Sequence, residues 1–371
     1  MTEQRGGRRG QLASSELRPG WTTGACATAA ARAAYTALLT GQFPDPVPVV
    51  LPQGRTPTFA LTAEAQGEGW AEAVITKDAG DDPDITHGAL VRVRVSAGEP
   101  GGGVGFRAGA GVGTITLPGL PLPVGEPAIN PMPRTMIIAN LRLAAGLDAE
   151  APDPDLLVTV GINDGEQLAA KTLNPRLGIV GGLSVLGTTG VVVPYSCSAW
   201  IDSIRRGVDV ARALGHHHVA GCTGSTSEKV AREVFGLPET ALLDMGDFAG
   251  AVLKYLRRHP IERLTLCGGV GKLAKLADGH LDLHSARSQV DTRFLAGLAR
   301  QVGADEQLAA AVAQATTALG AVELCAASGI ELGDAIAQAA RQVAAGVLGE
   351  APVAVDVICI DRAGTIVGHA R

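Results

Sequence analysis

The stretch HHHVAGCTGSTSEKVAREVF, residues 216–235, predicts an apolar strand, a turn of glycine and small hydroxyl residues, and then a helix. The same order of strand, turn and helix recurs along the second half of the chain. We place the further strands at LGIVGGLSV (177–185), ALLDMGD (241–247) and RLTLCGG (263–269), with helices from about 197, 248 and 270. Strands that alternate with helices predict a mostly parallel sheet covered on both faces.

The first half of the chain has a different texture. Residues 22–41 carry a capping threonine, an alanine-rich body and Gly41, which predict a helix. Short apolar or alternating segments separated by glycine and proline follow as far as about residue 130, and these predict strands. We therefore expect an α/β protein (α+β overall) with two domains. Residues 1–17 are expected to form a disordered tail. The first domain, at 18–175, is expected to be a β-rich mixed α+β domain. The second, at 176–371, is expected to be a three-layer Rossmann-like α/β domain that ends in helices and a hairpin.

Composition and charge exclude several classes of protein. The net charge is −6 and charged residues make up 18% of the chain, so no overall basic field favours nucleic acid. No apolar run of about 18 residues is free of breakers, and no apolar segment follows Arg8 and Arg9, which predicts a cytoplasmic protein without a membrane span or signal peptide. The six cysteines lack the paired spacing of zinc sites and disulfide frameworks.

Glycine-rich turns follow each strand of the expected parallel sheet. In such sheets, ligands bind beyond the carboxyl ends of the strands, where helix N-termini offer free N–H groups. The spacing of GGVGKL (268–273) does not fit a phosphate-binding P-loop, because Leu266 and Leu273 occupy positions that need Gly and Ser or Thr. A nucleoside or another polar small molecule fits these turns. The four turns lie at 181–190, 221–226, 245–247 and 268–272.

Two further loops combine groups that could act on a substrate. The loop TKDAGDDPDITHG, residues 76–88, brings Lys77, Asp81, Asp82 and His87 into one short segment, and a solvated acidic turn is the alternative interpretation. The proline-rich loop at 119–134 ends in Arg134, which suits a carboxylate ligand. We assign no metal site, because His216, His217 and His218 would alternate between the two faces of a strand.

Several of these segments together resemble a known family. WTTGACATAAARAA, KDAGDDPDITHG, GVGTITLPGLPLPVGEPAINPMPR, KTLNPRLGIVGGLSVLGTTGVVVPYS and GGVGKLAKLADGHLDLHS are similar, in this order, to the signature segments of the CbiD family. These are cobalt-precorrin-5B C1-methyltransferases of anaerobic cobalamin biosynthesis. The resemblance implies transfer of a methyl group from S-adenosylmethionine to carbon 1 of the macrocycle, giving cobalt-precorrin-6A, with cobalt present only within the substrate.

The resemblance also implies roles for particular residues. We expect the methyl donor to be cradled at the edge of the parallel sheet by the turn at 181–190, with Asp247 chosen by elimination for the ribose hydroxyls. The donor-binding residues of that turn are Gly181, Gly182, Ser184, Gly187, Thr188, Thr189 and Gly190.

The substrate implied by the resemblance is a flat ring with many carboxylates, so it needs cations and N–H donors around its rim. Asp81, Asp82 or His87, with Lys77 beside them, would orient the ring or accept a proton. The candidates for rim contacts are Thr22, Thr23, Arg134, Lys171, Arg176, Lys272, Lys275 and His284.

Two alternatives stay open from the sequence. One is a corrinoid- or tetrapyrrole-binding protein without catalysis, and the other is a nucleotide-dependent oxidoreductase on the same sheet. The second lacks the acidic residue that would hold a ribose at the end of the strand HHHVAG, residues 216–221. Formation of homo-oligomers is also left open.

Overall fold

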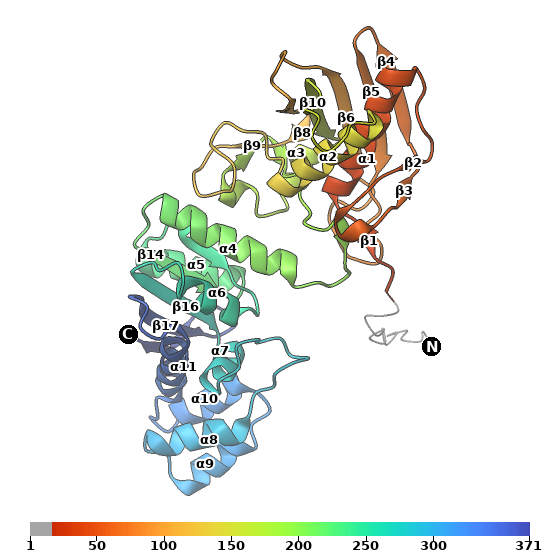
Figure 1. The fold of residues 1–371 in the computed structure, drawn as a ribbon. Helices are drawn as coiled ribbons and strands as arrows, with labels where there is room; N and C mark the ends of the chain where they lie inside the picture. The colour runs from red at the N-terminus through yellow and green to blue at the C-terminus, as the bar shows by residue number, and fades with distance from the viewer. Residues whose placement is uncertain (1–16) are drawn as a thin grey trace, which may run out of the picture. The chain divides into compact units, whose positions relative to one another are not determined.

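The computed structural model describes residues 17–371, which form two compact units (Figure 1). Of the described residues, the first unit contains 17–117 and 121–197, and the second contains 118–120 and 198–371. The expected boundary at residue 175 therefore differs from the boundary in the structure, since the segment 176–197 belongs to the first unit. The expected disordered tail lies, apart from Leu17, outside the described residues.

The first unit is built around the buried helix α1 (Thr23–Thr40). Thr22 caps it by accepting a hydrogen bond from the Ala25 N–H at 3.1 Å, and Gly41 ends it in the left-handed conformation with φ 78°. Most of its buried side chains are alanine, so neighbouring elements approach its backbone closely. α1 packs against a sheet and against helix α2 (Pro131–Ala144). The predicted helix at 22–41 is confirmed.

The sheet of the first unit has five strands in the order β4-β5-β6-β10-β7. All neighbours are antiparallel except β10 and β7, which run parallel. In β6 the residues alternate, with Val91, Val93 and Val95 fully buried in the core that includes α1, and Arg92 and Arg94 on the opposite face. The strands are β4 (Ala63–Gly67), β5 (Trp70–Thr76), β6 (Leu90–Ala97), β7 (Val104–Ala108) and β10 (Leu156–Ile162).

The segment 177–185 does not form a strand of the parallel sheet, so that prediction was wrong. It forms two short strands of the first unit instead: β11 (Ile179–Val180) pairs with β9 (Thr114–Ile115), and β12 (Gly182–Leu183) pairs with β8 (Gly111–Val112). Gly181, with φ 87°, separates the two strands. The remaining short elements are β1 (Gly20–Trp21), β13 (Val191–Val192), β2 (Val47–Pro48), β3 (Thr58–Phe59) and α3 (Gly165–Ala169).

The second unit contains the expected parallel sheet, in the order β15-β14-β16-β17-β18. Its first four strands are parallel and β18 is antiparallel to β17, which confirms both the α/β class and the C-terminal hairpin. β15, which follows β14 in the chain, lies on one side of β14 in the sheet, and β16, which comes next, lies on the other side of β14. The strands are β14 (His218–Cys222), β15 (Leu242–Asp244), β16 (Arg263–Gly269), β17 (Ala354–Ile360) and β18 (Ile366–Ala370).

Helices complete the layers of the second unit. α5 packs on β14, β15 and β16, α7 packs on β16 and β17, and α11 packs on β17, α6 and α7. No helix within residues 17–371 has the length and apolar character needed to cross a membrane. The helices are α4 (Ser198–Ala213), α5 (Ser225–Phe235), α6 (Ala249–Leu256), α7 (Val270–Ala277), α8 (Thr292–Gln301), α9 (Glu306–Ala313), α10 (Ala318–Ala326) and α11 (Leu332–Leu348).

The contact between α11 and β18 leads to a stability prediction. A Cβ at Gly333 would lie 1.7 Å from the Val367 carbonyl oxygen, whereas a Cβ at Gly346 of the same helix would meet nothing within 4 Å. Gly333→Ala should lower the free energy of unfolding by about 2–3 kcal/mol, because the strand must shift. Gly346→Ala should raise it by up to about 1 kcal/mol. Calorimetry of both variants checks this, and equal effects would show that α11 does not touch β18 as described.

Candidate functional site

A cavity of about 730 Å³ opens at the carboxyl ends of β14, β16 and β17, and we call it the sheet-edge cavity. It lies where the strand order reverses, between β14 and β16, which is the usual ligand position in open parallel sheets. The turns after β14 and β16, two of the four that were predicted to form a shared site, both line this cavity. The lining segments are 223–227, 269–272, 317–319 and 360–362.

Lys272 supplies a positive charge to the sheet-edge cavity. Its Nζ lies 3.1 Å from Asp247 Oδ1 and 3.3 Å from the Thr223 carbonyl oxygen. Asp247 Oδ1 is buried and makes no well-directed hydrogen bond within the described chain, so its contact with Lys272 is chiefly electrostatic. Asp247 does not line the cavity. It is therefore placed as the counter-ion of Lys272, and its predicted role toward ribose hydroxyls stays a prediction.

Asp361 is the carboxylate that lines this cavity at the end of β17, and sequence reasoning missed it. Its Oδ1 accepts hydrogen bonds from the Thr365 and Ala363 N–H groups, both at 2.8 Å. These bonds, that from Thr365 above all, lower the pKa of Asp361, so the group is ionised at neutral pH. Its position directly after the apolar run VICI (357–360) is the signal that could have found it.

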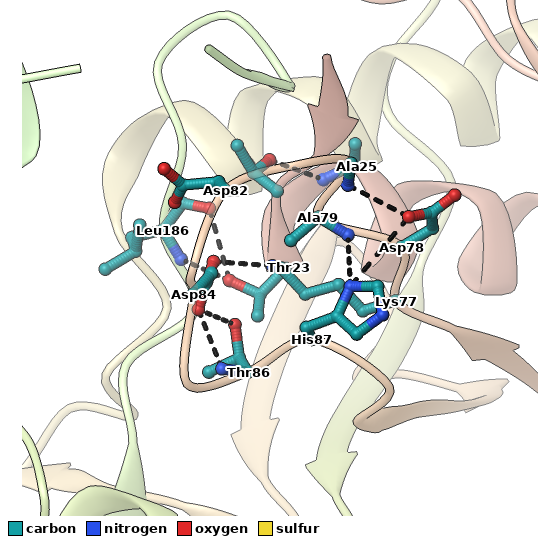
Figure 2. A network of polar contacts seen from close by, with 12 residues as sticks. Thr23, Ala25, Lys77, Asp78, Ala79, Asp82, Asp84, Thr86, His87 and Leu186 are labelled. Atoms are coloured by element: carbon teal, nitrogen blue, oxygen red, sulfur yellow. Dashed lines mark hydrogen bonds and ion pairs between the residues drawn. The ribbon is translucent and has the colours of Figure 1, made fainter. Parts of the chain in front are cut away.

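The loop at 76–88 holds a buried ion pair in the first unit. The side chain of Lys77 is 1% exposed, and its Nζ lies 2.6 Å from Asp84 Oδ2 (Figure 2). Asp84 Oδ1 accepts hydrogen bonds from the Thr86 N–H and hydroxyl. Burial raises the pKa of Asp84, but the Lys77 ammonium and the Thr86 hydrogen bonds outweigh it, so the pKa is lowered overall. Lys77 is therefore held in a buried ion pair that stabilises the loop.

The two predicted catalytic aspartates each hold the same loop to another segment. Asp81 Oδ2 accepts a hydrogen bond from the Arg18 N–H at 2.6 Å, and Asp82 Oδ1 accepts one from the Tyr195 N–H at 2.8 Å. Arg18 also forms an ion pair with Asp78, which lowers the pKa of Asp78 to about 2. Each carboxylate thus uses one oxygen in fixing the loop.

His87 is exposed, but its Nδ1 accepts a hydrogen bond from the Ala79 N–H at 3.1 Å (Figure 2). A ring nitrogen that accepts a hydrogen bond does not itself carry a proton. The outward nitrogen, Nε2, is then an N–H donor. His87 can orient an acceptor on a ligand in this form.

The turn at 181–190 is packed onto the start of α1. The Thr22 N–H donates to the Gly190 carbonyl, and the Gly24 N–H donates to the Leu186 carbonyl, both at 3.0 Å. The Thr23 hydroxyl donates to the Leu186 carbonyl and accepts from the Leu186 N–H. The predicted position of this turn at the edge of a parallel sheet is therefore wrong, because its strands and its polar partners all belong to the first unit.

The other members of the predicted donor-binding turn are also engaged locally. Gly182 is buried, and a Cβ there would lie 2.3 Å from the Gly111 backbone. Ser184 is 8% exposed and its hydroxyl donates to Asn174, while the Thr189 hydroxyl bonds with the Val191 backbone. Gly187 packs on Thr22, and only Gly181, Leu186 and Thr188 of this turn are exposed. Few polar groups of this turn are therefore free to bind a methyl donor.

The predicted rim residues are divided between the two units. Arg134 is used within the fold, since it donates to the Ile129 carbonyl at 2.8 Å and pairs with Glu126. Lys275 is 8% exposed and donates to the Leu283 carbonyl, and His284 Nδ1 accepts from the Ala286 N–H. Thr22, Thr23, Arg134, Lys171 and Arg176 belong to the first unit, and Lys272, Lys275 and His284 belong to the second.

The three consecutive histidines contact three different residues. His216 bonds with Thr240, His217 with Glu262 and His218 with Thr265, each at 2.8 Å. No group of three or more His, Cys, Asp or Glu side chains suited to a metal ion occurs within residues 17–371. Of the three, only His218 lies in β14 (His218–Cys222), so the expected alternation along a strand does not apply to His216 and His217.

Two family models and a curated relative match this sequence. The family model described as CbiD matches residues 11–194, and the model described as CbiD, C-terminal domain, matches residues 282–371. A relative from Paramagnetospirillum magneticum named cobalt-precorrin-5B C(1)-methyltransferase is 59% identical over 96% of this chain and 98% of its own length. The chain belongs to the CbiD family.

Two further similarities were found. A CbiD relative from Agrobacterium fabrum with the same name is 56% identical over 95% of this chain and 93% of its own length. The crystal structure titled cobalamin biosynthesis protein (cbiD) from Archaeoglobus fulgidus is 28% identical and covers 68% of this chain and 77% of that chain, with a TM-score of 0.38. The residues of this CbiD chain that line the sheet-edge cavity at 223–227 and 269–272 lie between the ranges of the two family models.

The Lys77–Asp84 pair of this CbiD chain gives a prediction on pH and stability. The pKa of Asp84 is lower in the folded state, so its stabilising contribution is complete above the unfolded pKa of about 3.9 and is lost as the pH falls through the folded pKa. Asp84→Asn should cost about 3 kcal/mol at pH 7, because Lys77 stays buried without its partner. The variant should also lose less further stability than the wild type between about pH 5 and pH 3.

Urea unfolding measured by fluorescence in a Trp200→Phe background tests this, because the two remaining tryptophans, Trp21 and Trp70, both belong to the first unit. Asp148→Asn, at an exposed position of the same unit, is the control and should change little. Parallel stability curves for the wild type and Asp84→Asn would contradict the ion pair.

Proposed function

We infer that this chain is a methyltransferase that acts on carbon 1 of cobalt-precorrin-5B in cobalamin biosynthesis. The observation that carries this inference is the 59% identity to a relative of that name over nearly the full length of both chains. Matches to both family models support it. The substrate is accordingly a small tetrapyrrole with a bound cobalt ion.

The methyl donor that we propose is S-adenosylmethionine. Its sulfonium carbon is attacked by a ring carbon, so that the carbon–sulfur bond breaks as the new carbon–carbon bond forms and S-adenosylhomocysteine leaves. Charge is dispersed in such a displacement, and the protein therefore contributes mainly by aligning the two reactants and excluding water. A strong acid or base near the methyl group is not required.

We place the donor in the sheet-edge cavity and not at the turn 181–190. The cavity has a volume within the range of about 300–1,000 Å³ that is typical of small-molecule sites. The N-termini of α5 and α7 both reach its lining, and their free N–H groups favour an anionic group. The turn 181–190, in contrast, spends most of its polar groups on α1.

The lining residues suggest how the donor would be held. The carboxylate of the methionine part fits near Lys272 and the first N–H groups of the two helices. Asp361, ionised and half-buried at the cavity lining, is suited to accept hydrogen bonds from ribose hydroxyls. Asp81, Asp82 and His87 stay the predicted groups for orienting the ring or accepting a proton, and their engagement in the loop favours orientation.

Incubation of the purified protein with methyl-labelled S-adenosylmethionine and cobalt-precorrin-5B tests the function directly. We expect label in the ring, at carbon 1, and formation of S-adenosylhomocysteine. A protein that binds the corrinoid but transfers no label would be a carrier, and one that responds to nicotinamide cofactors instead would be an oxidoreductase. Either result would contradict the proposal.

Substitution of Lys272 tests the location of the donor. Lys272→Gln removes a charge-assisted contact and should weaken S-adenosylhomocysteine binding by about 10- to 100-fold in calorimetric titration. Lys254→Gln, on the exposed surface of α6, is the matched control and should bind as the wild type does. Asp361→Asn provides a second variant that leaves the Lys272–Asp247 pair intact. Unchanged affinity in both cavity variants would exclude this location.

A further inference from the structure

The open face of the sheet in the first unit has no role in the function as described so far. We propose that this face binds carboxylate side chains of the tetrapyrrole through Arg92, Arg94 and Arg107, an inference that rests on the proposed function for its ligand class. A cavity of about 640 Å³ lies over this face, and all three arginines line it. We call the sheet surface formed by these three arginines the arginine face.

The strand register brings these side chains together. Arg94 of β6 lies opposite Thr159 of β10, and Thr159 lies opposite Arg107 of β7. On the other side Arg94 lies opposite Glu72 of β5, so four residues form one row across four strands. Residues directly opposite one another share a face of a sheet, and strands are about 4.8 Å apart. Arg94 and Arg107 therefore rise from backbones about 10 Å apart.

Glu72 fixes two of the three guanidinium groups. It is 7% exposed and accepts hydrogen bonds from Arg92 at 2.5 Å and from Arg94 Nε at 3.1 Å. The Arg94 guanidinium also lies over the Trp70 ring, 4.0 Å from its centroid. Arg94 donates to Glu72 only through Nε, so the two terminal nitrogens of the Arg94 guanidinium stay available for a ligand. This arrangement prepares them for an incoming carboxylate, since little side-chain freedom is left to lose.

Arg107 is the least engaged member of the arginine face. It is exposed, and it forms no ion pair or side-chain hydrogen bond with any residue in the described part of the chain. A guanidinium group on a sheet surface that lacks a protein carboxylate is suited to receive one from a ligand. Arg107 is thus the residue whose replacement should affect ligand binding with least effect on the fold.

Glycine forms much of the floor of this cavity. Gly161 lies opposite Arg92, and Gly109 and Gly111 also line the cavity, so backbone is exposed where side chains would otherwise project. A flat ring can approach such a floor closely, and its peripheral carboxylates would then reach the arginines. Several cationic groups spread over about 10 Å match several carboxylates around a macrocycle better than they match one compact anion.

Besides Glu72, which is paired with Arg92 and Arg94, two further acidic residues line the cavity at the turn that follows β10. Asp164 and Glu166 lie in and after the turn that follows β10, whereas the arginines lie on the strands. A ligand rich in carboxylates would be repelled at the turn and attracted over the strands. The charge pattern therefore fixes the direction in which the ring's carboxylates point.

Fluorescence titration with uroporphyrin, a tetrapyrrole with eight carboxylates, tests the arginine face without the methyl donor. Arg107→Gln and Arg94→Gln should each weaken binding by about 10- to 100-fold, because each loses a charge-assisted contact. Arg107→Lys, which keeps the charge but loses the fork geometry, should be intermediate. Arg55→Gln removes an exposed arginine elsewhere in the first unit and should have no effect.

S-adenosylhomocysteine binding and thermal unfolding should be unchanged in Arg107→Gln. Variants that bind uroporphyrin within twofold of the wild type would overturn the arginine face, as would a wild type that does not bind it. Methyl transfer by the wild type is measured separately. If transfer occurs while the variants bind normally, only the arginine face is wrong, and if the variants bind weakly while no transfer occurs, only the proposed function is wrong.

Discussion

The start of α1 and the turn at 181–190 satisfy one another's polar groups, and the first unit depends on this contact. Thr22 and Gly24 donate to carbonyls of the turn, and Thr23 bonds with Leu186 through both its donor and its acceptor. Buried backbone groups without partners are costly, so the contact fixes both segments. The 76–88 loop joins the same region, because the Trp21 N–H donates to the Asp78 carbonyl.

This use of polar groups decides where ligands can bind. A segment that has spent its amides and hydroxyls within the fold has few left for a methyl donor, even when its composition resembles a ligand-binding turn. Free groups lie at two other places: the carboxyl ends of β14 and β16, and the outward face of β6, β10 and β7. The first suits a nucleoside-containing donor, and the second suits a flat polyanion.

Local patterns predicted a large part of the fold. The alanine-rich helix with Thr22 and Gly41 at its ends, the strand and helix units after residue 216, and the C-terminal hairpin each follow from periodicity and capping. The strand at 177–185 could not be placed in this way, because its apolar residues fit a parallel sheet equally well. Only pairing with residues more than sixty positions earlier, at 111–115, decides its unit.

The candidate site was less predictable, because it too depends on contacts that the local pattern does not determine. The sequence placed Lys77 in a functional loop, yet its partner Asp84 and its burial depend on how that loop folds back. The arginines of the sheet were present as the alternation VRVRV (91–95), which predicts two cations on one face of a strand. What the sequence could not supply was β7, whose parallel pairing with β10 brings Arg107 into the same row.

Hydrogen–deuterium exchange with and without S-adenosylhomocysteine tests the central claim, that the donor binds at the edge of the parallel sheet of the second unit. Slower exchange is expected at the amides of 223–227 and 269–272, with no change at 181–190. Slower exchange confined to 181–190 would contradict it.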